Sequence, residues 1–495
     1  MKRSSGILMP IFSLPSPYGI GTLGKEAYAF VDFLKKAGQT WWQLLPLGPT
    51  SYGDSPYQSP SSFAGNPYFI DPDMLAEDGL LTEAELKEYS FGKDPQRVDY
   101  CLLYKNRYRM LKAAATRGMG KYGKEIAEFR RDQAEWLEDY ALFMAAKKHF
   151  DMVCWLEWPD EKLIKRDPET LAFYREKLKE EIDFQVFMQF MFFRQWAALK
   201  DYAKAAGIKL FGDIPLYVAL DSADVWAAPH FFKLDERNYP VQVSGVPPDY
   251  FTADGQLWGN PLYDYDAMER DGFGWWIRRI AGAGRLYDAI RIDHFRGLAS
   301  YWSVPYGETT AKNGHWEKGP GMKLIRVLKG WFPELQFIAE DLGYPAPDVA
   351  QLLTDSGFPG MKVLEFAFDS RDESSYLPHT YHRNCICYTG THDNDTLLGW
   401  KSHALKEDLQ KAKAYLGLNS TEGFAWGIIR GGMSSVADLF IAQMQDYLGL
   451  GTKARVNIPG KPAGNWQWRM LPGAYDDKLA EKIRTLTELF GRCGG

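Results

Sequence analysis

Three short apolar runs in the chain each end in a carboxylate. The runs cover residues 286–293, 335–340 and 385–393, and they end in Asp293, Glu340 and Asp393. A parallel α/β barrel gathers the C-terminal ends of its strands on one face, so carboxylates far apart in sequence can meet around one substrate. Two of them can break a glycosidic bond: one attacks the anomeric carbon, and the other protonates the leaving oxygen and then deprotonates the incoming alcohol or water. A third can stabilise positive charge on the sugar ring.

The first of these runs carries an arginine two residues before its carboxylate. Arg291 and Asp293 therefore share one face of a strand, where the fixed charge of Arg291 would keep the carboxylate ionised. A nucleophile needs that ionised state at neutral pH. The alternative for this segment is a purely structural Arg–Asp pair at a strand end. Asp213 ends another apolar run, and we expect it to support Arg291 and the nucleophile without reacting.

Glu340 ends the run 337–340 and is followed by Asp341. A carboxyl at the end of a buried strand, close to a second negative charge, keeps its proton to higher pH, which suits a general acid. The alternative is that Glu340 or Asp341 caps the following helix.

The densest polar segment after a strand is 388–396. His392 and Asp393 could bind two adjacent hydroxyls of one sugar, and His294 offers another donor. Asp395 is a rival for the catalytic position, but it lies in or beyond the following turn, so we predict a helix-capping role for it.

Aromatic residues make up 15% of the chain, and several lie in Pro- and Gly-rich segments. Sugar rings stack their C–H faces on such side chains. The candidates are Tyr52, Tyr57, Tyr250, Phe251, Trp258 and Trp466. For any one of them alone, packing in the core is the competing interpretation.

Eight strand-like runs predict the fold. They lie at about 6–11, 40–46, 208–214, 286–293, 335–340, 361–367, 385–392 and 437–443, with helical patterns between them. This alternation predicts an α/β protein, a (β/α)8 TIM barrel, in which residues 1–495 form one elaborated domain. The long gap after the second strand predicts a mainly helical inserted subdomain at about 50–200. A second insertion, at about 219–285, is rich in Pro, Gly and aromatic residues. The last forty residues are too few for a C-terminal β-sandwich.

The composition excludes several classes of partner. The 58 basic and 64 acidic residues are mixed along the chain and give a net charge of −6, so we expect no nucleic acid and no membrane as partners. No apolar stretch of signal-peptide length follows the N-terminus, which predicts a cytoplasmic protein. The five cysteines are an odd number in a large chain, so disulfides are not expected. No metal or cofactor motif is present, and we predict neither.

With these residues located, the chain resembles the amylomaltases, also called disproportionating enzymes or 4-α-glucanotransferases, of the α-amylase clan. The resemblance spans nearly all 495 residues and depends on motifs that occur in the family's order. These motifs are residues 5–8, 13–21, 55–60, 63–67, 212–215, 291–296, 339–343, 390–395 and 464–469. The resemblance implies a barrel without the C-terminal β domain of true amylases, and transfer of α-1,4-glucan segments between maltooligosaccharides or glucans.

The resemblance also implies residue roles. Asp293 would be the nucleophile, Glu340 the acid/base and Asp393 the transition-state stabiliser. The positions implied to contact the sugar or line the glucan groove are Arg291, His294, His392, Tyr57, Asp249, Trp258 and Asn457. The loop around Tyr250 is similar to one that closes over the substrate in relatives, which makes the second insertion a substrate-covering one.

The expected mechanism is a double displacement with retained configuration, which requires the two reacting carboxyl groups to lie about 5–5.5 Å apart. One alternative is an α-glucan hydrolase of the same clan, because only the acceptor differs. A second is a non-catalytic glucan-binding protein with a decayed site, which the intact carboxylate trio disfavours.

Overall fold

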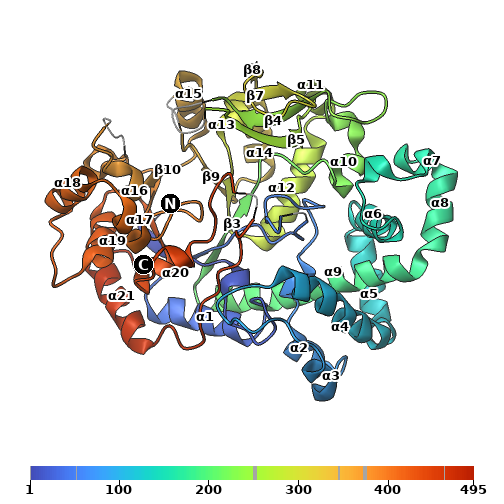
Figure 1. Ribbon diagram of the computed structural model, residues 1–495, viewed down its shortest axis with the longest axis horizontal. Coiled ribbons are helices and arrows are strands. Elements are labelled where there is room, and N and C mark those ends of the chain that lie inside the picture. The colour runs from blue at the N-terminus through green and yellow to red at the C-terminus, as the bar shows by residue number, and fades with distance from the viewer. Residues whose placement is uncertain are drawn as a thin grey trace.

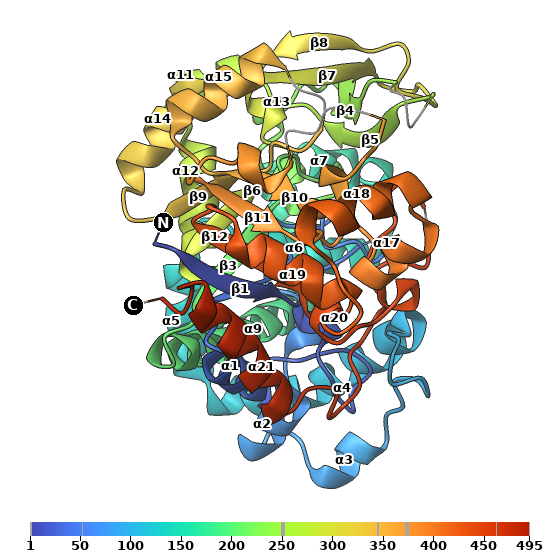
Figure 2. The ribbon, with the colours of Figure 1, turned by 90° about the vertical axis from the view of Figure 1, so that its left-hand side faces the viewer.

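The computed structural model describes residues 2–51, 53–248, 253–343, 346–371, 376–461 and 463–494. At its centre, eight parallel strands form one sheet in the order β10-β11-β12-β1-β2-β3-β6-β9 (Figures 1 and 2). A backbone hydrogen bond of 3.0 Å from Ala339 at the end of β9 to Pro359 before β10 joins the two edges of this sheet into a barrel. The strands are β1 (Ser4–Leu8), β2 (Trp41–Gln43), β3 (Lys209–Ile214), β6 (Ala289–Ile292), β9 (Gln336–Ala339), β10 (Gly360–Val363), β11 (Cys385–Tyr388) and β12 (Leu439–Gln443).

The eight strands expected from the apolar runs are confirmed, but most of them are shorter than predicted, and two of the runs continue into helical turns. The first strand ends at Leu8, and the run continues through Pro10 into a 3-10 turn, η1 (Ile11–Ser13). The sixth ends at Val363, and the rest of its apolar run forms the short helix α16 (Leu364–Ala367). A short apolar run reports burial but does not distinguish a strand from a buried helical turn.

Amphipathic helices cover the outside of the barrel. In α1 (Lys25–Lys36), the buried side chains include Ala27, Phe30, Val31 and Leu34. This spacing of three and four residues places one apolar stripe against the strands. Burying a side chain such as Phe30 stabilises the fold by about 1.5–3 kcal/mol. The other long helices after β3 are α12 (Gly274–Leu286), α14 (Met322–Trp331), α15 (Pro347–Ser356), α18 (Lys406–Leu416), α19 (Phe424–Ser434) and α21 (Asp477–Leu489).

The chain between β2 and β3 is mostly helical and lies to the right in Figure 1. It contains η2 (Pro67–Phe69), α2 (Pro72–Glu77), α3 (Glu83–Lys87), α4 (Tyr100–Lys121), α5 (Gly123–Asp132), α6 (Leu137–His149), η3 (Trp155–Glu157), α7 (Glu161–Ile164), α8 (Pro168–Lys177) and α9 (Lys179–Ala205). The buried amide of Gln189 in α9 accepts from Gly65 N at 2.7 Å and donates to Gly65 O at 2.9 Å. This pair of bonds fixes the segment before α2, which carries Tyr57, against the long helix.

A second sheet, of four antiparallel strands, packs beside the barrel at the top of Figure 2. Its order is β5-β4-β7-β8, from β4 (Gln242–Val246), β5 (Gln256–Pro261), β7 (Ser300–Pro305) and β8 (His315–Lys318). The sequence predicted only a loop-rich insertion here, because β4 and β5 are short, interrupted by glycine, and paired with strands that come after β6. The same region contains α10 (Ala223–Ala227), η4 (Pro229–Phe231), α11 (Tyr265–Arg270) and α13 (Arg296–Ala299).

After β12, the described residues form α20 (Met444–Tyr447), η6 (Thr452–Ala454) and α21. The remaining elements between β10 and α18 are η5 (Pro378–Thr380) and α17 (Leu397–His403). None of the helices in the described ranges is long and apolar enough to cross a bilayer.

The two chain ends lie close together, and a buried arginine joins them (Figures 1 and 2). Arg492 donates to Ser4 O in β1 at 2.9 Å and to the carbonyl oxygens of Met433, Ser435 and Ala437 before β12. Arg492 is fully buried. Burial lowers its pKa to about 10, so it remains charged at neutral pH.

We expect Arg492→Ala to lower the free energy of unfolding by about 2–4 kcal/mol, because it leaves buried carbonyl groups short of donors. Urea denaturation measures this change. Arg484→Ala is the control, since Arg484 lies in α21, the helix just before Arg492, but pairs with Glu488 at the surface. That variant should lose less than about 0.5 kcal/mol. Equal losses in the two variants would contradict the role of Arg492.

Candidate active site

The register of the barrel strands places Asp213 beside Arg291, and Asp293 level with Glu340. Asp213 in β3 is the direct partner of Arg291 in β6, so the two side chains share one face. Ile292 is the partner of Ala339 in β9, and Glu340 N donates to Ile292 O at 3.1 Å. Asp293 directly follows Ile292 at the end of β6, and Glu340 directly follows Ala339 at the end of β9. Both carboxylates stand at the C-terminal ends of neighbouring strands.

Arg291 connects two carboxylates. Its Nη1 donates to both oxygens of Asp213, at 2.9 and 2.7 Å, and its Nη2 contacts Asp293 Oδ1 at 2.8 Å. Arg291 and Asp213 are almost fully buried, whereas the side chain of Asp293 is 29% exposed. Burial opposes the charge of Arg291, but Asp213 and Asp293 outweigh it and hold the pKa of the guanidinium well above its ordinary value. The structure thus presents one accessible carboxylate beside a permanent cation.

Glu340 lies in a different environment. Its carboxylate accepts from His294 N at 2.8 Å and from Leu342 N at 2.8 Å. These bonds and Arg291 favour the ionised form, but burial and the nearby charge of Asp293 oppose it. Burial dominates and raises the pKa of Glu340 to about 8. The site therefore contains a carboxyl that keeps its proton at neutral pH.

The backbone at His294 directs its N–H toward Glu340. His294 adopts a φ of +49°, in the left-handed region that only a few per cent of non-glycine residues occupy. Such a conformation persists where surrounding contacts enforce it. Here the ring of Trp258 from β5 lies edge-on to the imidazole, with centroids 4.7 Å apart. Burial lowers the pKa of His294 to about 4, so the ring is neutral at neutral pH.

Asp393 reaches the same site through a chain of hydrogen bonds. Tyr57 donates to Asp213 Oδ2 at 2.8 Å, and its hydroxyl also contacts His392 Nε2 at 2.9 Å. His392 Nε2 lies 3.4 Å from Asp393 Oδ1. Asn457 Nδ2 donates to the same oxygen at 2.6 Å. The side chain of Asp393 is 42% exposed. All three carboxylates from the apolar runs therefore belong to one connected cluster.

The aromatic candidates divide into three groups. Tyr57 stacks on His392, with centroids 5.2 Å apart, and Trp466 is buried against both rings. Trp258 is partly buried beside His294. The candidates Asp249 and Tyr250, together with Tyr52 and Phe251, lie outside the described residues.

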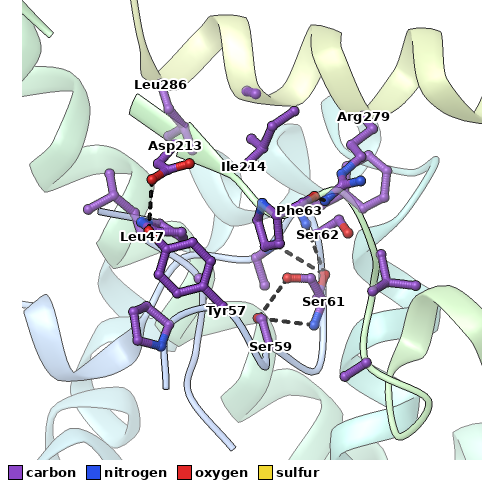
Figure 3. Close-up of a pocket in the computed structure, with 18 of the residues that line it drawn as sticks. Leu47, Tyr57, Ser59, Ser61, Ser62, Phe63, Asp213, Ile214, Arg279 and Leu286 are labelled. Atoms are coloured by element: carbon purple, nitrogen blue, oxygen red, sulfur yellow. Dashed lines mark hydrogen bonds between the residues drawn. The ribbon is translucent and has the colours of Figure 1, made fainter. Parts of the chain in front are cut away.

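A small pocket lies beside Tyr57 and Asp213 (Figure 3). Its volume is about 50 Å³, and Ser59, Ser61 and Arg279 are among the residues that line it. Since a water molecule takes up about 30 Å³ of liquid, this space is suited to a very few waters and is too small for a glucosyl ring. The two accessible carboxylates, Asp293 and Asp393, do not line this pocket.

Two capping interpretations from the sequence are wrong. Ala346 is the N-cap of α15, and Asp341 instead accepts from Met361 N at 2.7 Å, so neither Glu340 nor Asp341 caps that helix. Thr396 is the N-cap of α17, whereas the buried carboxylate of Asp395 accepts from Thr452 Oγ1 at 2.8 Å.

The sequence analysis missed Arg455, which donates to Asp393 O and, at 2.7 Å, to Asn457 O. An isolated arginine outside the strand ends carries no pattern that would have singled it out. Among the residues that the structure describes, no group of three or more His, Cys, Asp or Glu side chains is arranged to hold a metal ion.

Comparison with known proteins identifies the family. An eight-stranded barrel with acidic side chains at the C-terminal ends of its strands has the architecture of a (β/α)8-barrel enzyme. A family model described as 4-alpha-glucanotransferase matches residues 9–474. The 4-alpha-glucanotransferase of Clostridium butyricum is 48% identical over 487 residues, covering 98% of this chain and 100% of the relative. The chain belongs to the 4-alpha-glucanotransferase family.

Solved structures agree. An amylomaltase from Streptococcus agalactiae, determined in complex with acarbose, is 41% identical and matches with a TM-score of 0.97, covering 100% of both chains. An amylomaltase from Corynebacterium glutamicum shares the fold at 18% identity, with a TM-score of 0.77 over 99% of this chain and 75% of that one.

The raised pKa of Glu340 predicts how the free energy of unfolding depends on pH. Folding raises this pKa from an ordinary value of 4.5 to about 8. Between these pH values the unfolded chain loses the proton while the folded protein keeps it, so the free energy of unfolding falls as pH rises. Glu340→Gln cannot ionise. Its free energy of unfolding should therefore increase relative to the wild type from pH 4.5 to 8, by up to about 1.4 kcal/mol for each unit of pKa shift. Urea denaturation over a series of pH values measures this difference.

Glu317→Gln is the control with the opposite sign. Lys233 and neighbouring hydroxyl groups outweigh burial and lower the pKa of Glu317, so this variant should lose stability relative to the wild type as pH rises through the acidic range. A Glu340→Gln difference that stays constant with pH would show that Glu340 is not perturbed.

Proposed function

We propose that the protein transfers α-1,4-glucan segments from one maltooligosaccharide or glucan to another by a retaining double displacement. The observation that carries this proposal is the contrast between two neighbouring carboxyl groups. Asp293 is accessible and paired with a buried cation, whereas Glu340 is buried and retains its proton. One nucleophile and one acid are what a retaining mechanism requires. Membership in the 4-alpha-glucanotransferase family supports transfer as the outcome.

In the first half-reaction, Asp293 attacks the anomeric carbon of the donor. The glycosidic bond breaks, Glu340 gives its proton to the leaving oxygen, and a covalent glucosyl-enzyme forms. Asp393 stabilises the positive charge that develops on the ring in both transition states. Arg291 contacts Asp293 and orients it, and Asp213 holds Arg291 in place without reacting.

In the second half-reaction, the 4-hydroxyl of an acceptor glucan replaces water as the attacking group. Glu340, now ionised, removes the proton of this hydroxyl as the new bond to the anomeric carbon forms and the bond to Asp293 breaks. A bound acceptor held in attack geometry has a very high effective concentration, which favours transfer over hydrolysis. We assign binding of the glucan to Tyr57, His294, His392, Trp258 and Asn457, and to Asp249 and Tyr250 outside the described residues.

No step of this mechanism needs a metal or an organic cofactor. The partners are α-1,4-glucans and maltooligosaccharides, which serve as both donor and acceptor. We also propose a cytoplasmic location, because the five cysteines are free thiols, as is typical of proteins in a reducing compartment. Fractionation of cells followed by immunoblotting tests this location.

The experiment that tests the function uses maltotriose as the only substrate. Transfer predicts a ladder of longer and shorter maltooligosaccharides together with glucose, resolved by chromatography. An α-glucan hydrolase would give glucose and maltose without longer products. A non-catalytic binding protein would give none of these.

Asp293→Asn completes this test, since it removes the nucleophile but leaves the shape of the site. We expect turnover to fall by more than about 10³-fold, while maltooligosaccharide binding measured by calorimetry persists. Asp355→Asn, an exposed change in α15, should leave both unchanged. Full turnover by Asp293→Asn would contradict the proposed mechanism.

A further inference from the structure

The loop that carries His392 and Asp393 is closed at its two ends by one buried aspartate. This loop, residues 389–396, connects β11 to α17. Asp446 in α20 accepts from Thr389 Oγ1 at 2.6 Å and from Leu397 N at 2.7 Å. The residues that provide these donors lie immediately before and after the catalytic segment. Asp446 therefore bridges the base of the loop.

We propose that Asp446 is a positioning residue for Asp393. It does not touch the reacting sugar, but it fixes the separation of the two ends of the loop on which Asp393 is presented. This inference depends on the proposed function, because it assumes that Asp393 acts in the transition state.

The chemistry of the position supports an aspartate. A backbone N–H and a hydroxyl both donate here, and a carboxylate can accept from both at once. Asp446 is 1% exposed, and Thr389 is fully buried. Losing the side chain would leave two buried donors without their acceptor.

Other contacts hold the middle of the loop, and backbone bonds also hold Thr389 at its base, where Thr389 N donates to Ile441 O at 3.2 Å and Thr389 O accepts from Glu365 N at 3.3 Å. Asp446 adds the contact that ties Thr389 to Leu397 across the base. Gln443 in β12 donates to Asp395 O at 3.1 Å. Arg455 donates to Asp393 O, and Asn457 N donates to His392 O at 3.2 Å. With these contacts intact, loss of Asp446 should shift the loop without unfolding it.

The loop also has no spare space on the side of α16. Gly390 packs against the carboxyl of Glu365, and a Cβ added at Gly390 would lie 2.9 Å from Glu365 Oε1. A widened base therefore cannot be absorbed by movement toward Glu365. The displacement would be transmitted instead to Asp393, whose carboxylate faces the substrate side.

A shift of this kind affects the transition state more than substrate binding. A charge-stabilising carboxylate acts mainly on the oxocarbenium-like state, so its misplacement lowers kcat with little change in KM. A displacement of about 1 Å can cost up to about 10²-fold in rate.

The test compares three variants. Asp446→Ala should lower kcat for maltotriose by about 10- to 100-fold, with KM within about threefold of the wild type. Asp446→Asn should restore most of the activity, because its carbonyl still accepts from Leu397 N and its amide can donate to a rotated Thr389 hydroxyl. Thr389→Val keeps the shape of the side chain but removes the hydroxyl that donates to Asp446, so it should give an intermediate loss of kcat. If Asp446→Ala does not fold, Thr389→Val provides the test of the positioning role instead.

Asp167→Ala is the matched control. Asp167 also accepts from a threonine hydroxyl and a helix N–H, at 2.8 and 3.0 Å, but it lies at the start of α8 in the helical segment. This variant should lose thermal stability without losing kcat. Turnover by Asp446→Ala at the wild-type rate would overturn the positioning role. If that variant does not fold, turnover by Thr389→Val at the wild-type rate would overturn it.

A double-mutant cycle with Asp393→Asn separates this inference from the proposed function. If Asp446 acts through Asp393, then Asp446→Ala should cause little further loss of kcat in the Asp393→Asn background. An equal loss in both backgrounds would overturn the positioning role and leave the proposed function intact. Wild-type turnover by Asp393→Asn alone would overturn the role of Asp393 and, with it, that of Asp446.

Discussion

The site depends on one buried guanidinium shared by two carboxylates. Arg291 donates to Asp213 on one side and contacts Asp293 on the other. Burying charges is costly unless they are paired with good geometry. Here Nη1 of Arg291 donates to both oxygens of Asp213, and Nη2 is left for Asp293. Without Arg291, two carboxylates and Glu340 would face one another in a poorly solvated space. The pair with Asp213 thus allows a charged Asp293 to stand beside a protonated Glu340.

The parallel barrel makes this arrangement possible. By register alone, neighbouring strands place Asp213 beside Arg291 and bring Asp293 level with Glu340. The segment before α2 then brings Tyr57 over the barrel, where its hydroxyl connects Asp213 to His392. Parts of the site that come from strand ends are fixed by the sheet, and parts that come from loops are fixed by side-chain bonds such as those of Gln189 and Asp446. Stability and function therefore share the same contacts.

The sequence predicted the parts of the site that follow strand ends. Arg291 and Asp293 could be placed on one face because the side-chain period of a strand is two. The hydrogen bonds of Tyr57 could not be predicted, since they join residues 156 and 335 positions apart. The same holds for Arg455, which bonds main-chain carbonyl groups, and for Asp446, which bonds a threonine hydroxyl and a main-chain N–H; neither leaves a sequence pattern. The antiparallel sheet was missed because its four strands are short and come from two separated segments.

The most direct test of the account is to trap the covalent intermediate. Glu340→Gln, supplied with α-glucosyl fluoride, can form the glucosyl-enzyme because fluoride needs no protonation, but it lacks the base for the second step. Mass spectrometry of the digested protein should find one glucosyl unit attached to the peptide that contains Asp293. A label on any other residue, or a product with inverted configuration and no label, would contradict the central role of Asp293.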